Sequence, residues 1–320
     1  MKSDSVIGTS GGSNRPSSIW PHRIAVILAC FTFPLLFIGG LVTGKGVGLA
    51  VPDWPTTFGY NMFLYPWSKM VGGIFYEHSH RLVASLVGLL TIAVAVTIWL
   101  REERNWLRWL GIGALGLVIA QGVLGGLRVV LIEHTLAIVH AATAQVFFAL
   151  TVCLAIFTSS AWRRSPDRPL KNSRRLLRLC AITTAFIYAQ IVFGGVLRHS
   201  GERLDAHLAF AALVAIHVIL TVMRVSRHHA DVAPLMRSAL LLFVLLLAQV
   251  ALGGAAYVAK FTVLWAVSFD AIVWVTTLHL ALGALMLAAS VTLTLRVYRL
   301  SARAADDPRR KEILAEQFSL

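Results

Sequence analysis

Long apolar segments, separated by short polar ones, make up most of the chain. A transmembrane helix needs about 20 consecutive apolar residues. Eight segments meet this requirement, at about residues 24–43, 74–100, 107–130, 135–158, 178–198, 206–224, 238–258 and 272–296. The pattern therefore predicts an all-α integral membrane protein in which eight transmembrane helices lie in the lipid bilayer.

The composition supports this prediction and excludes other classes of protein. Hydrophobic residues make up 57% of the chain and charged residues only 14%, whereas a soluble domain carries about 25% charged residues. A soluble enzyme, a disordered chain and a secreted disulfide scaffold are thereby excluded. The three cysteines lie in or beside apolar segments, where they read as small core residues.

The basic residues indicate the orientation in the membrane. The net charge is +14, but the basic residues form short clusters between apolar segments, so nucleic-acid binding is not expected. Of the 29 lysines and arginines, 22 lie in the two tails and the loops after even-numbered segments, and seven lie on the other side. The positive-inside rule then places both termini in the cytoplasm.

A basic segment between Arg163 and Arg178 separates the first four apolar segments from the last four, and similar residue spacings on its two sides suggest a duplication. Three odd-numbered segments carry a glutamine followed by a glycine pair four and five residues later, and similar sequences follow His80 and His207, which are 127 residues apart. We interpret the chain as two repeat-related four-helix bundles. The predicted parts are a disordered cytoplasmic tail (1–18), an amino-terminal unit (19–160), a basic cytoplasmic linker (161–177), a carboxy-terminal unit (178–298) and a cytoplasmic tail (299–320).

Four histidines lie at similar depth near the outer ends of the even-numbered segments: His80, His140, His207 and His279. Each unit then holds two imidazoles on different helices, an arrangement suited to the axial ligands of a haem iron in a helical bundle. Zinc normally needs three or four close ligands, and each unit offers two. His134 and His217 are alternatives, and His217 stays open as a ligand in place of His207. Four more read as solvated residues: His22, His199, His228 and His229.

The two units differ around the first histidine. Glu77 and Arg81 share one helical face with His80, whereas the second unit has leucines at the equivalent positions. Glu77 is therefore a candidate for proton transfer, and Arg81 for binding a haem propionate. A long outer loop at about residues 44–73 occurs only in the first unit, and its Asp53 and Trp54 are candidates for a lid. These differences predict a catalytic first unit and a second unit that only holds a cofactor.

The loop sequence GLAVPDWPTTFG, the EHSHR sequence at the start of the second segment and the duplicated units with paired histidines resemble the haem A synthase family over about residues 24–298. The resemblance implies oxidation of a methyl substituent of haem O to a formyl group, giving haem A, with dioxygen and external electrons. It implies haem O ligands at His80 and His140, an essential Glu77, and a resident haem b held by His207 and His279. It also implies a bacterial-type cell membrane, haem sites toward its outer face, and haem O synthase and the cytochrome oxidase assembly machinery as partners.

One feature departs from the family. Many bacterial members have a cysteine pair in this loop, where this chain has Val51 and Thr57. Loop thiol chemistry, including a role in electron delivery, is therefore not available here. Two other functions would use the same four histidines: a di-haem b carrier that oxidises quinol, and a haem transporter or chaperone. A pure carrier has no need of Glu77 or of a loop on one unit only, and a transporter or chaperone predicts weak ligation and no change in the porphyrin.

Overall fold

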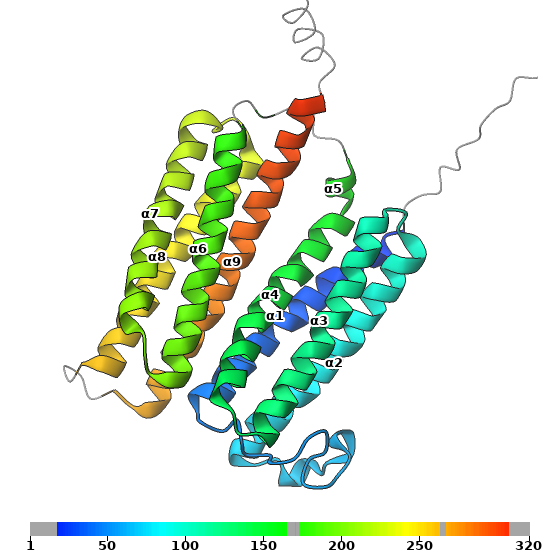
Figure 1. The fold of residues 1–320 in the computed structure, drawn as a ribbon, viewed down its shortest axis with the longest axis vertical. Helices are drawn as coiled ribbons and strands as arrows, with labels where there is room; N and C mark the ends of the chain where they lie inside the picture. The colour runs from blue at the N-terminus through cyan, green and yellow to red at the C-terminus, as the bar shows by residue number, and fades with distance from the viewer. Residues whose placement is uncertain (1–17, 165–169, 171–172, 263–266, 307–320) are drawn as a thin grey trace, which may run out of the picture.

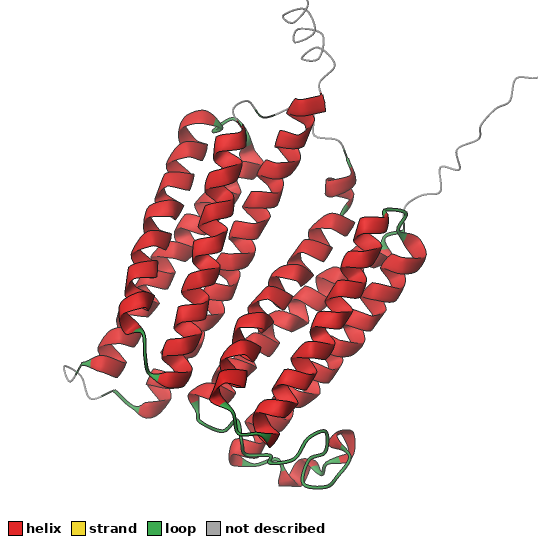
Figure 2. Ribbon diagram, in the orientation of Figure 1, coloured by secondary structure: helices red, strands yellow, loops and turns green. Residues whose placement is uncertain are grey.

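The computed structural model describes residues 18–164, 170, 173–262 and 267–306. Eight long helices account for most of these residues (Figures 1 and 2): α1 (Trp20–Gly44), α2 (Gly72–Arg101), α3 (Asn105–Val130), α4 (His134–Thr158), α6 (Ser173–Ser200), α7 (Leu204–His228), α8 (Ala233–Phe261) and α9 (Phe269–Asp306). Shorter helices are α5 (Ser160–Arg163), η1 (Met62–Leu64) and η2 (Trp67–Lys69). No strand is found in the described ranges, where a single bridge joins Thr57 and Tyr60.

The eight predicted segments correspond to the eight long helices, and each of these is long and apolar enough to cross a membrane. The chain is therefore an integral membrane protein. Two predicted boundaries differ from the observed ones. Helix α6 begins at Ser173, inside the predicted linker, and α9 continues to Asp306, inside the predicted carboxy-terminal tail. Apart from Ser18, the predicted amino-terminal tail lies outside the described residues.

Proline and positive φ angles mark several helix ends. Pro21 and Pro234 occupy the first turns of α1 and α8, where a missing backbone N–H costs nothing. Gly72 and Gly201 have φ angles of +55° and +77°, a region that glycine enters without the steric cost of a side chain. Gly72 begins α2, and Gly201 directly follows α6, so each marks the limit of a helix.

The long helices form two groups that lie side by side (Figure 1). Helices α1–α4 pack together, as do α6–α9, and the groups meet where α1 and α4 contact α9 and where α4 contacts α6. The long loop at residues 45–71, the short connections after α3 and α6, the last turn of α8 and the first turn of α9 lie at one end of the molecule, which we term the loop end. Both described termini lie at the opposite end.

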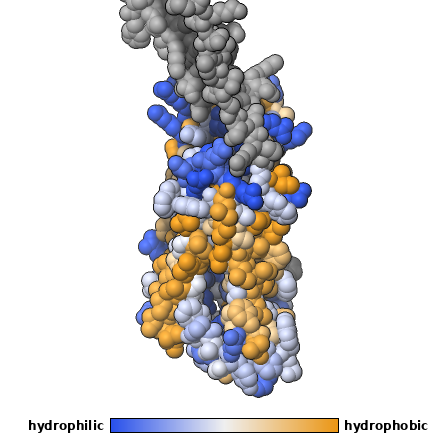
Figure 3. Space-filling model, turned by 90° about the vertical axis from the view of Figure 1, so that its right-hand side faces the viewer, coloured by the Kyte–Doolittle hydropathy of each residue, from blue (hydrophilic) through white to orange (hydrophobic). Residues whose placement is uncertain are grey.

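Tight packing is concentrated away from the loop end. In the first group the fully buried side chains of Leu28, Ile98, Leu107 and Leu154 belong to one core cluster, and all four lie near the helix ends farthest from the loop. A second cluster fills the corresponding part of α6–α9. Apolar side chains also cover the middle of the outer surface in Figure 3, and polar ones gather toward the terminus end. The half of the bundle nearest the loop end contains a cavity.

Candidate functional site

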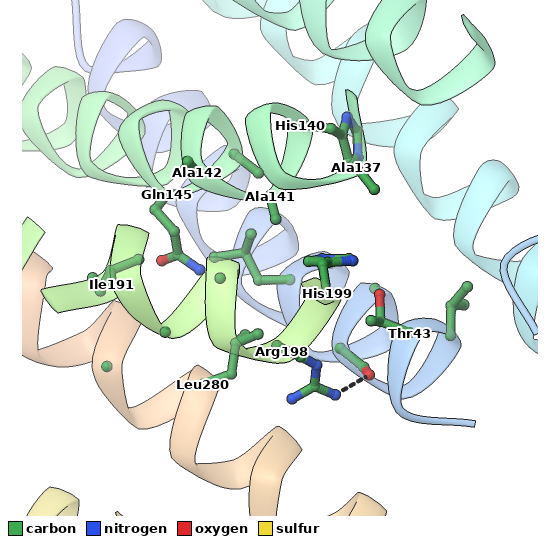
Figure 4. A pocket seen from close by; sticks show the side chains of 18 of the residues that line it. Thr43, Ala137, His140, Ala141, Ala142, Gln145, Ile191, Arg198, His199 and Leu280 are labelled. Atoms are coloured by element: carbon green, nitrogen blue, oxygen red, sulfur yellow. Dashed lines mark hydrogen bonds between the residues drawn. The ribbon is translucent and has the colours of Figure 1, made fainter. Parts of the chain in front are cut away.

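A cavity of about 1290 Å³ reaches into both helix groups near the loop end. Four of its lining residues are the histidines predicted as ligands: His80, His140, His207 and His279. Small and aliphatic side chains make up much of the remaining wall. Figure 4 shows Ala141, Ala142 and Gln145 of α4 on one side of the cavity and Ile191 of α6 on the other. The sites in the two groups are thus parts of one continuous space.

His207 and His279 face each other across α6–α9. Their ring centroids are 6.3 Å apart, and the ring planes are inclined by 75°. A metal–imidazole bond is about 2 Å long, so two rings that bind one metal from opposite sides should have centroids about 6 Å apart. The observed spacing therefore leaves room for one metal ion between the two rings.

Each of the four histidine rings packs against the first glycine of a glycine pair on the preceding long helix. A β-carbon on that glycine would lie 3.0 Å from Cε1 of His80 (Gly39), 3.2 Å from that of His140 (Gly125), 3.0 Å from that of His207 (Gly194) and 3.0 Å from that of His279 (Gly253). Because real β-carbons rarely approach this closely, glycine is what allows each ring to sit so near the neighbouring helix.

The second glycine of each pair behaves differently in the two groups. In the first group, a β-carbon on Gly40 would meet Thr277 of α9, and one on Gly126 would collide with the ring of Trp54. In the second group, β-carbons on Gly195 and Gly254 would meet no atom within 4 Å. These two glycines therefore provide controls for the ones that contact histidines.

We predict that Gly253→Ala weakens haem binding by His279, whereas Gly254→Ala does not. The added methyl group at position 253 must push the ring from its place, and a displaced rotamer costs about 0.5–1.5 kcal/mol. Affinity should then fall by up to about tenfold. The measurement is haem content and the low-spin absorption spectrum of the two purified variants. Equal spectra would show that this glycine contact does not position the ligand.

The residues present fit a haem better than a bare metal ion. Within the described ranges, no group of three or more His, Cys, Asp or Glu side chains could hold a metal ion by itself. A haem already supplies four nitrogen ligands and needs only the axial pair. The Nδ1 atoms of all four histidines are buried and have no hydrogen-bond partner among the described residues. The paired rings and the apolar walls of the cavity suit a large flat macrocycle.

Two glutamines lie directly against the second histidine pair. The Nε2 atom of Gln190 is 3.3 Å from Nε2 of His207, and that of Gln249 is 3.4 Å from Nε2 of His279. In the sequence these glutamines stand out only as markers of a repeat. Their fixed spacing before the glycine pairs was the signal that could have placed them in the site.

His217 does not share this arrangement. Its Nδ1 atom lies 2.8 Å from the carbonyl oxygen of Leu213 on its own helix, and its ring packs against Phe186 with centroids 4.6 Å apart. The structure therefore brings His207, and not His217, opposite His279. His134 begins α4 and is exposed, away from the pair of rings that includes His140.

Glu77 connects the start of α2 to the long loop. The side chain is 4% exposed. Its Oε1 atom accepts a hydrogen bond from Nη2 of Arg81 at 2.8 Å, and its Oε2 atom accepts one from the backbone N–H of Val51 at 2.9 Å. Glu77 also lines the cavity. It is thus placed both to hold the loop and to face a bound ligand.

Arg81 is bound mainly to the loop. Its Nη1 atom donates to the backbone oxygens of Asp53 and Thr56, at 2.7 and 3.1 Å, and its Nη2 atom donates to that of Val51 at 2.9 Å as well as to Glu77. These four bonds use both terminal nitrogens of the guanidinium group and leave Nε. Arg81 therefore has little donor capacity left for the predicted contact with a propionate.

A second attachment of the loop involves His78, which the sequence analysis did not single out. Thr57 Oγ1 lies 3.1 Å from Nδ1 of His78, and the imidazole packs against Tyr65 with ring centroids 5.1 Å apart. Thr57 and His78 are 0% and 1% exposed. The signal in the sequence was the cluster of polar residues Glu77, His78 and Arg81 in the first turns of α2. This cluster follows the loop directly and places polar side chains beside it.

The two predicted lid residues have different positions. Trp54 lies against Gly126 of α3 and lines the cavity together with Pro55, so it covers the first group as a lid would. Asp53 instead orders the loop. Burial opposes ionisation of its carboxyl, but hydrogen bonds from Gly59, Thr56 and Phe58 outweigh burial and lower the pKa of Asp53 to about 2.

His199 is not in a solvated loop, as the sequence analysis expected. Helix α6 continues to Ser200, past the last apolar residues, and His199 lines the cavity across from His140 (Figure 4). Arg198 precedes it, and Arg128 of α3 lines the same cavity. From the sequence both arginines indicate only the orientation in the membrane, because the apolar pattern does not reveal which helix face a terminal residue occupies.

Comparison with known proteins supports the reading of the site. The model of the COX15-CtaA family, described as cytochrome oxidase assembly protein, matches residues 22–206. The chain is similar to Heme A synthase of Shouchella clausii (strain KSM-K16), with 34% identity over 135 residues, 41% of this chain and 44% of the relative.

A second relative is Heme A synthase of Alkalihalophilus pseudofirmus (strain ATCC BAA-2126 / JCM 17055 / OF4), with 30% identity over 181 residues, 55% of this chain and 59% of the relative. The matches span about half the length of these curated relatives. The family match covers more than half of this chain, and it includes the long loop, Glu77, both histidines of the first group and Gly194 with its neighbours. The protein therefore belongs to the COX15-CtaA family of cytochrome oxidase assembly proteins.

Proposed function

We propose that this protein is a haem A synthase, which oxidises a methyl substituent of haem O to a formyl group. The proposal rests chiefly on one observation, the pair of facing imidazoles 6.3 Å apart inside a cavity that also contains a second histidine pair. Membership of a cytochrome oxidase assembly family, and relatives named Heme A synthase, agree with it. Successive hydroxylations consume dioxygen, electrons and protons, and release water.

The two helix groups would have different tasks. We assign haem O to the first group, with His80 and His140 as ligands, and a resident haem b to the second, with His207 and His279. The bound haem b would supply electron transfer. The loop supports this division because Glu77 and Arg81 fasten it to α2 and Trp54 covers Gly126, all in the first group. Among the described residues, the second group has no comparable loop over it.

The residues of the first group would position the substrate and exclude water. His80 and His140 would hold the haem, and Trp54 would cover the cavity at the loop end. Glu77 would hold or move a proton at its carboxylate, because it lines the cavity in a water-poor position. Haem O synthase and the oxidase assembly machinery would stand on either side of this step, supplying haem O and receiving haem A.

The two groups would also be related by duplication. All four histidines pack on the first glycine of a pair, one residue type in one position on each of four helices. Gln121, Gln190 and Gln249 precede three of these pairs by the same four residues. Shared ancestry of two four-helix units explains both patterns, since lipid-facing packing alone does not demand them.

The proposed orientation puts both termini in the cytoplasm of a bacterial-type cell. The basic residues support this orientation, since 22 of the 29 lysines and arginines lie in the tails or in the loops at the end of the molecule opposite the 45–71 loop. The loop end, and with it the cavity, would then lie toward the outer face of the membrane.

The decisive test is the haem that the protein produces. We expect acid extraction of cells that express this chain together with a haem O supply to yield a haem with a formyl group. A matched culture that expresses the His80→Ala variant should yield haem O unchanged. If the wild-type extract contains haem O only, the protein would instead be an electron carrier or a haem chaperone.

A further inference from the structure

Three cationic or ionisable side chains lie together at the loop end of the cavity without an acidic partner. They are Arg128 of α3 and Arg198 and His199 of α6, and all three line the cavity. Within the part of the chain that the structure describes, neither arginine forms an ion pair. His199 directly follows Arg198 on α6, and Arg128 lines the same cavity from α3.

Arg198 has a donor that faces no protein acceptor. Its Nη2 atom donates to the carbonyl oxygen of Gly40 at 2.7 Å and to Oγ1 of Thr277 at 3.3 Å, and Nη1 donates to the carbonyl oxygen of Thr276 at 3.1 Å. Its Nε atom is buried and has no partner among the described residues. The guanidinium group is thus fixed between α1, α6 and α9, close to the helix positions beside His80 and His279.

Arg128 is held more loosely. Its Nη2 atom donates to the carbonyl oxygen of Gly48 at 3.1 Å. Glu77 is close enough to act on its charge, but both carboxylate oxygens of Glu77 already accept hydrogen bonds from Arg81 and Val51. The charge of Arg128 therefore has no acidic group of its own.

Packing does not explain these arginines. At the positions equivalent to Arg198, four residues after the first glycine of each pair, the other helices carry Thr43, Val129 and Tyr257. At those equivalent to Arg128, three residues after it, they carry Val42, Leu197 and Ala256. Both arginines are half-buried, and an ionisable residue within a membrane span normally marks a function. The cluster therefore calls for an anion from outside the protein.

The positions of the arginines divide them between the two histidine pairs. Arg128 lies on α3, three residues after the glycine that packs against His140, and it bonds to Gly48 in the loop of the first group. Arg198 bonds to Thr276 and Thr277 of α9, three and two residues before His279. Each arginine thus lies on the loop side of one pair, where the edge of a macrocycle held by that pair could reach it.

We propose that Arg128 and Arg198 form carboxylate sites at the interface of the two helix groups. Arg128 binds the carboxylates of the haem held by His80 and His140, and Arg198 binds those of the haem held by His207 and His279, with His199 between them. This inference rests on the proposed function and adds the direction in which both macrocycles point. Arg81, the residue that the sequence suggested for a propionate, then serves the loop.

The test compares protohaem with its dimethyl ester, which has the same macrocycle but no carboxylates. Both probes are titrated into haem-depleted full-length protein in detergent. The His80→Ala variant isolates the second site, and the His279→Ala variant isolates the first. Charge-assisted hydrogen bonds should make the free acid bind about tenfold to a hundredfold more tightly than the ester. Arg198→Gln should remove this preference at the second site, and Arg128→Gln at the first.

Arg296→Gln is the matched control. Arg296 also donates from its guanidinium to a helix carbonyl, that of Pro234 at 2.9 Å, and to Ser238, but it lies at the opposite end of the helices. This variant should keep the full preference for the acid. Should Arg198→Gln fail to fold, Arg198→Lys keeps the charge and should retain part of the preference.

The outcomes separate this inference from the proposed function. Equal binding of acid and ester by the protein with both arginines intact, or a full preference in the Gln variants, would overturn the carboxylate sites and leave the haem sites standing. A preference lost equally in Arg198→Lys and Arg198→Gln would also count against a charge interaction. Absence of low-spin binding of either probe at both sites would instead refute the haem assignments themselves.

Discussion

Replacing His279 with alanine is expected to remove the low-spin b-type haem spectrum of the purified protein. His279 and His207 face each other with centroids 6.3 Å apart, so loss of either ring leaves the iron with one axial ligand. A five-coordinate iron is no longer low-spin, and much of the haem should be lost during purification. Absorption spectra of the oxidised and dithionite-reduced protein provide the measurement, and His207→Ala should behave in the same way.

His217→Ala is the control for this prediction. His217 bonds to the carbonyl oxygen of Leu213 and packs on Phe186, so its loss should leave the low-spin spectrum in place. If the spectrum survives in His207→Ala and disappears in His217→Ala, the assignment of the ligand pair is wrong.

Glu77→Ala is expected to abolish formation of the formyl haem while haem b content stays close to that of the wild type. The carboxylate lines the first part of the cavity, and the second histidine pair lies in the other helix group. Its removal also leaves Arg81 and the N–H of Val51 without their partner, at a cost of about 1–3 kcal/mol for each unsatisfied buried group. Haem extracted from the variant should be haem O, and its haem b spectrum should be unchanged.

Two further variants separate a proton-transfer role of Glu77 from attachment of the loop. Glu77→Gln keeps the shape of the side chain, but the amide cannot exchange a proton at a useful pKa. Its NH₂ group would also face a hydrogen-bond donor, either Arg81 or the backbone N–H of Val51. Thr57→Val loosens the loop at His78 and leaves Glu77 intact. Activity that survives Thr57→Val but not Glu77→Gln supports proton transfer. Equal losses in both variants would reduce Glu77 to a residue that positions the loop, and full activity of Glu77→Gln would exclude the proton-transfer role.

The sequence was sufficient for the membrane-spanning architecture because apolar length is a local property. All eight segments were found, and the family was recognised from the loop and the first turns of α2. Helix ends were harder, as α6 and α9 show, because a helix can continue through polar residues beyond the membrane-length apolar segment. Ser173 at the start of α6 and Asp306 at the end of α9 are both polar.

The four histidines of the cavity could be found because each lies near the outer end of an even-numbered apolar segment, and because similar sequences follow His80 and His207. The arginines could not, because their role depends on contacts between distant segments. Arg198 bonds to the carbonyl oxygen of Gly40, 158 residues away, and nothing in the local pattern around either residue indicates this. His78 was missed for a similar reason, since its partner Thr57 lies in an irregular loop whose path the sequence does not predict.

The way the loop is fastened has a consequence for the conditions in which it keeps its shape. At the two positions where many bacterial relatives are expected to have cysteines, Val51 and Thr57 are both fully buried, and each bonds to α2 through Glu77 or His78. A disulfide opens when the surrounding thiol pool becomes sufficiently reducing. Hydrogen bonds and burial carry no such dependence, so this cover should stay closed in the presence of dithiothreitol or glutathione and should assemble without a disulfide-forming catalyst.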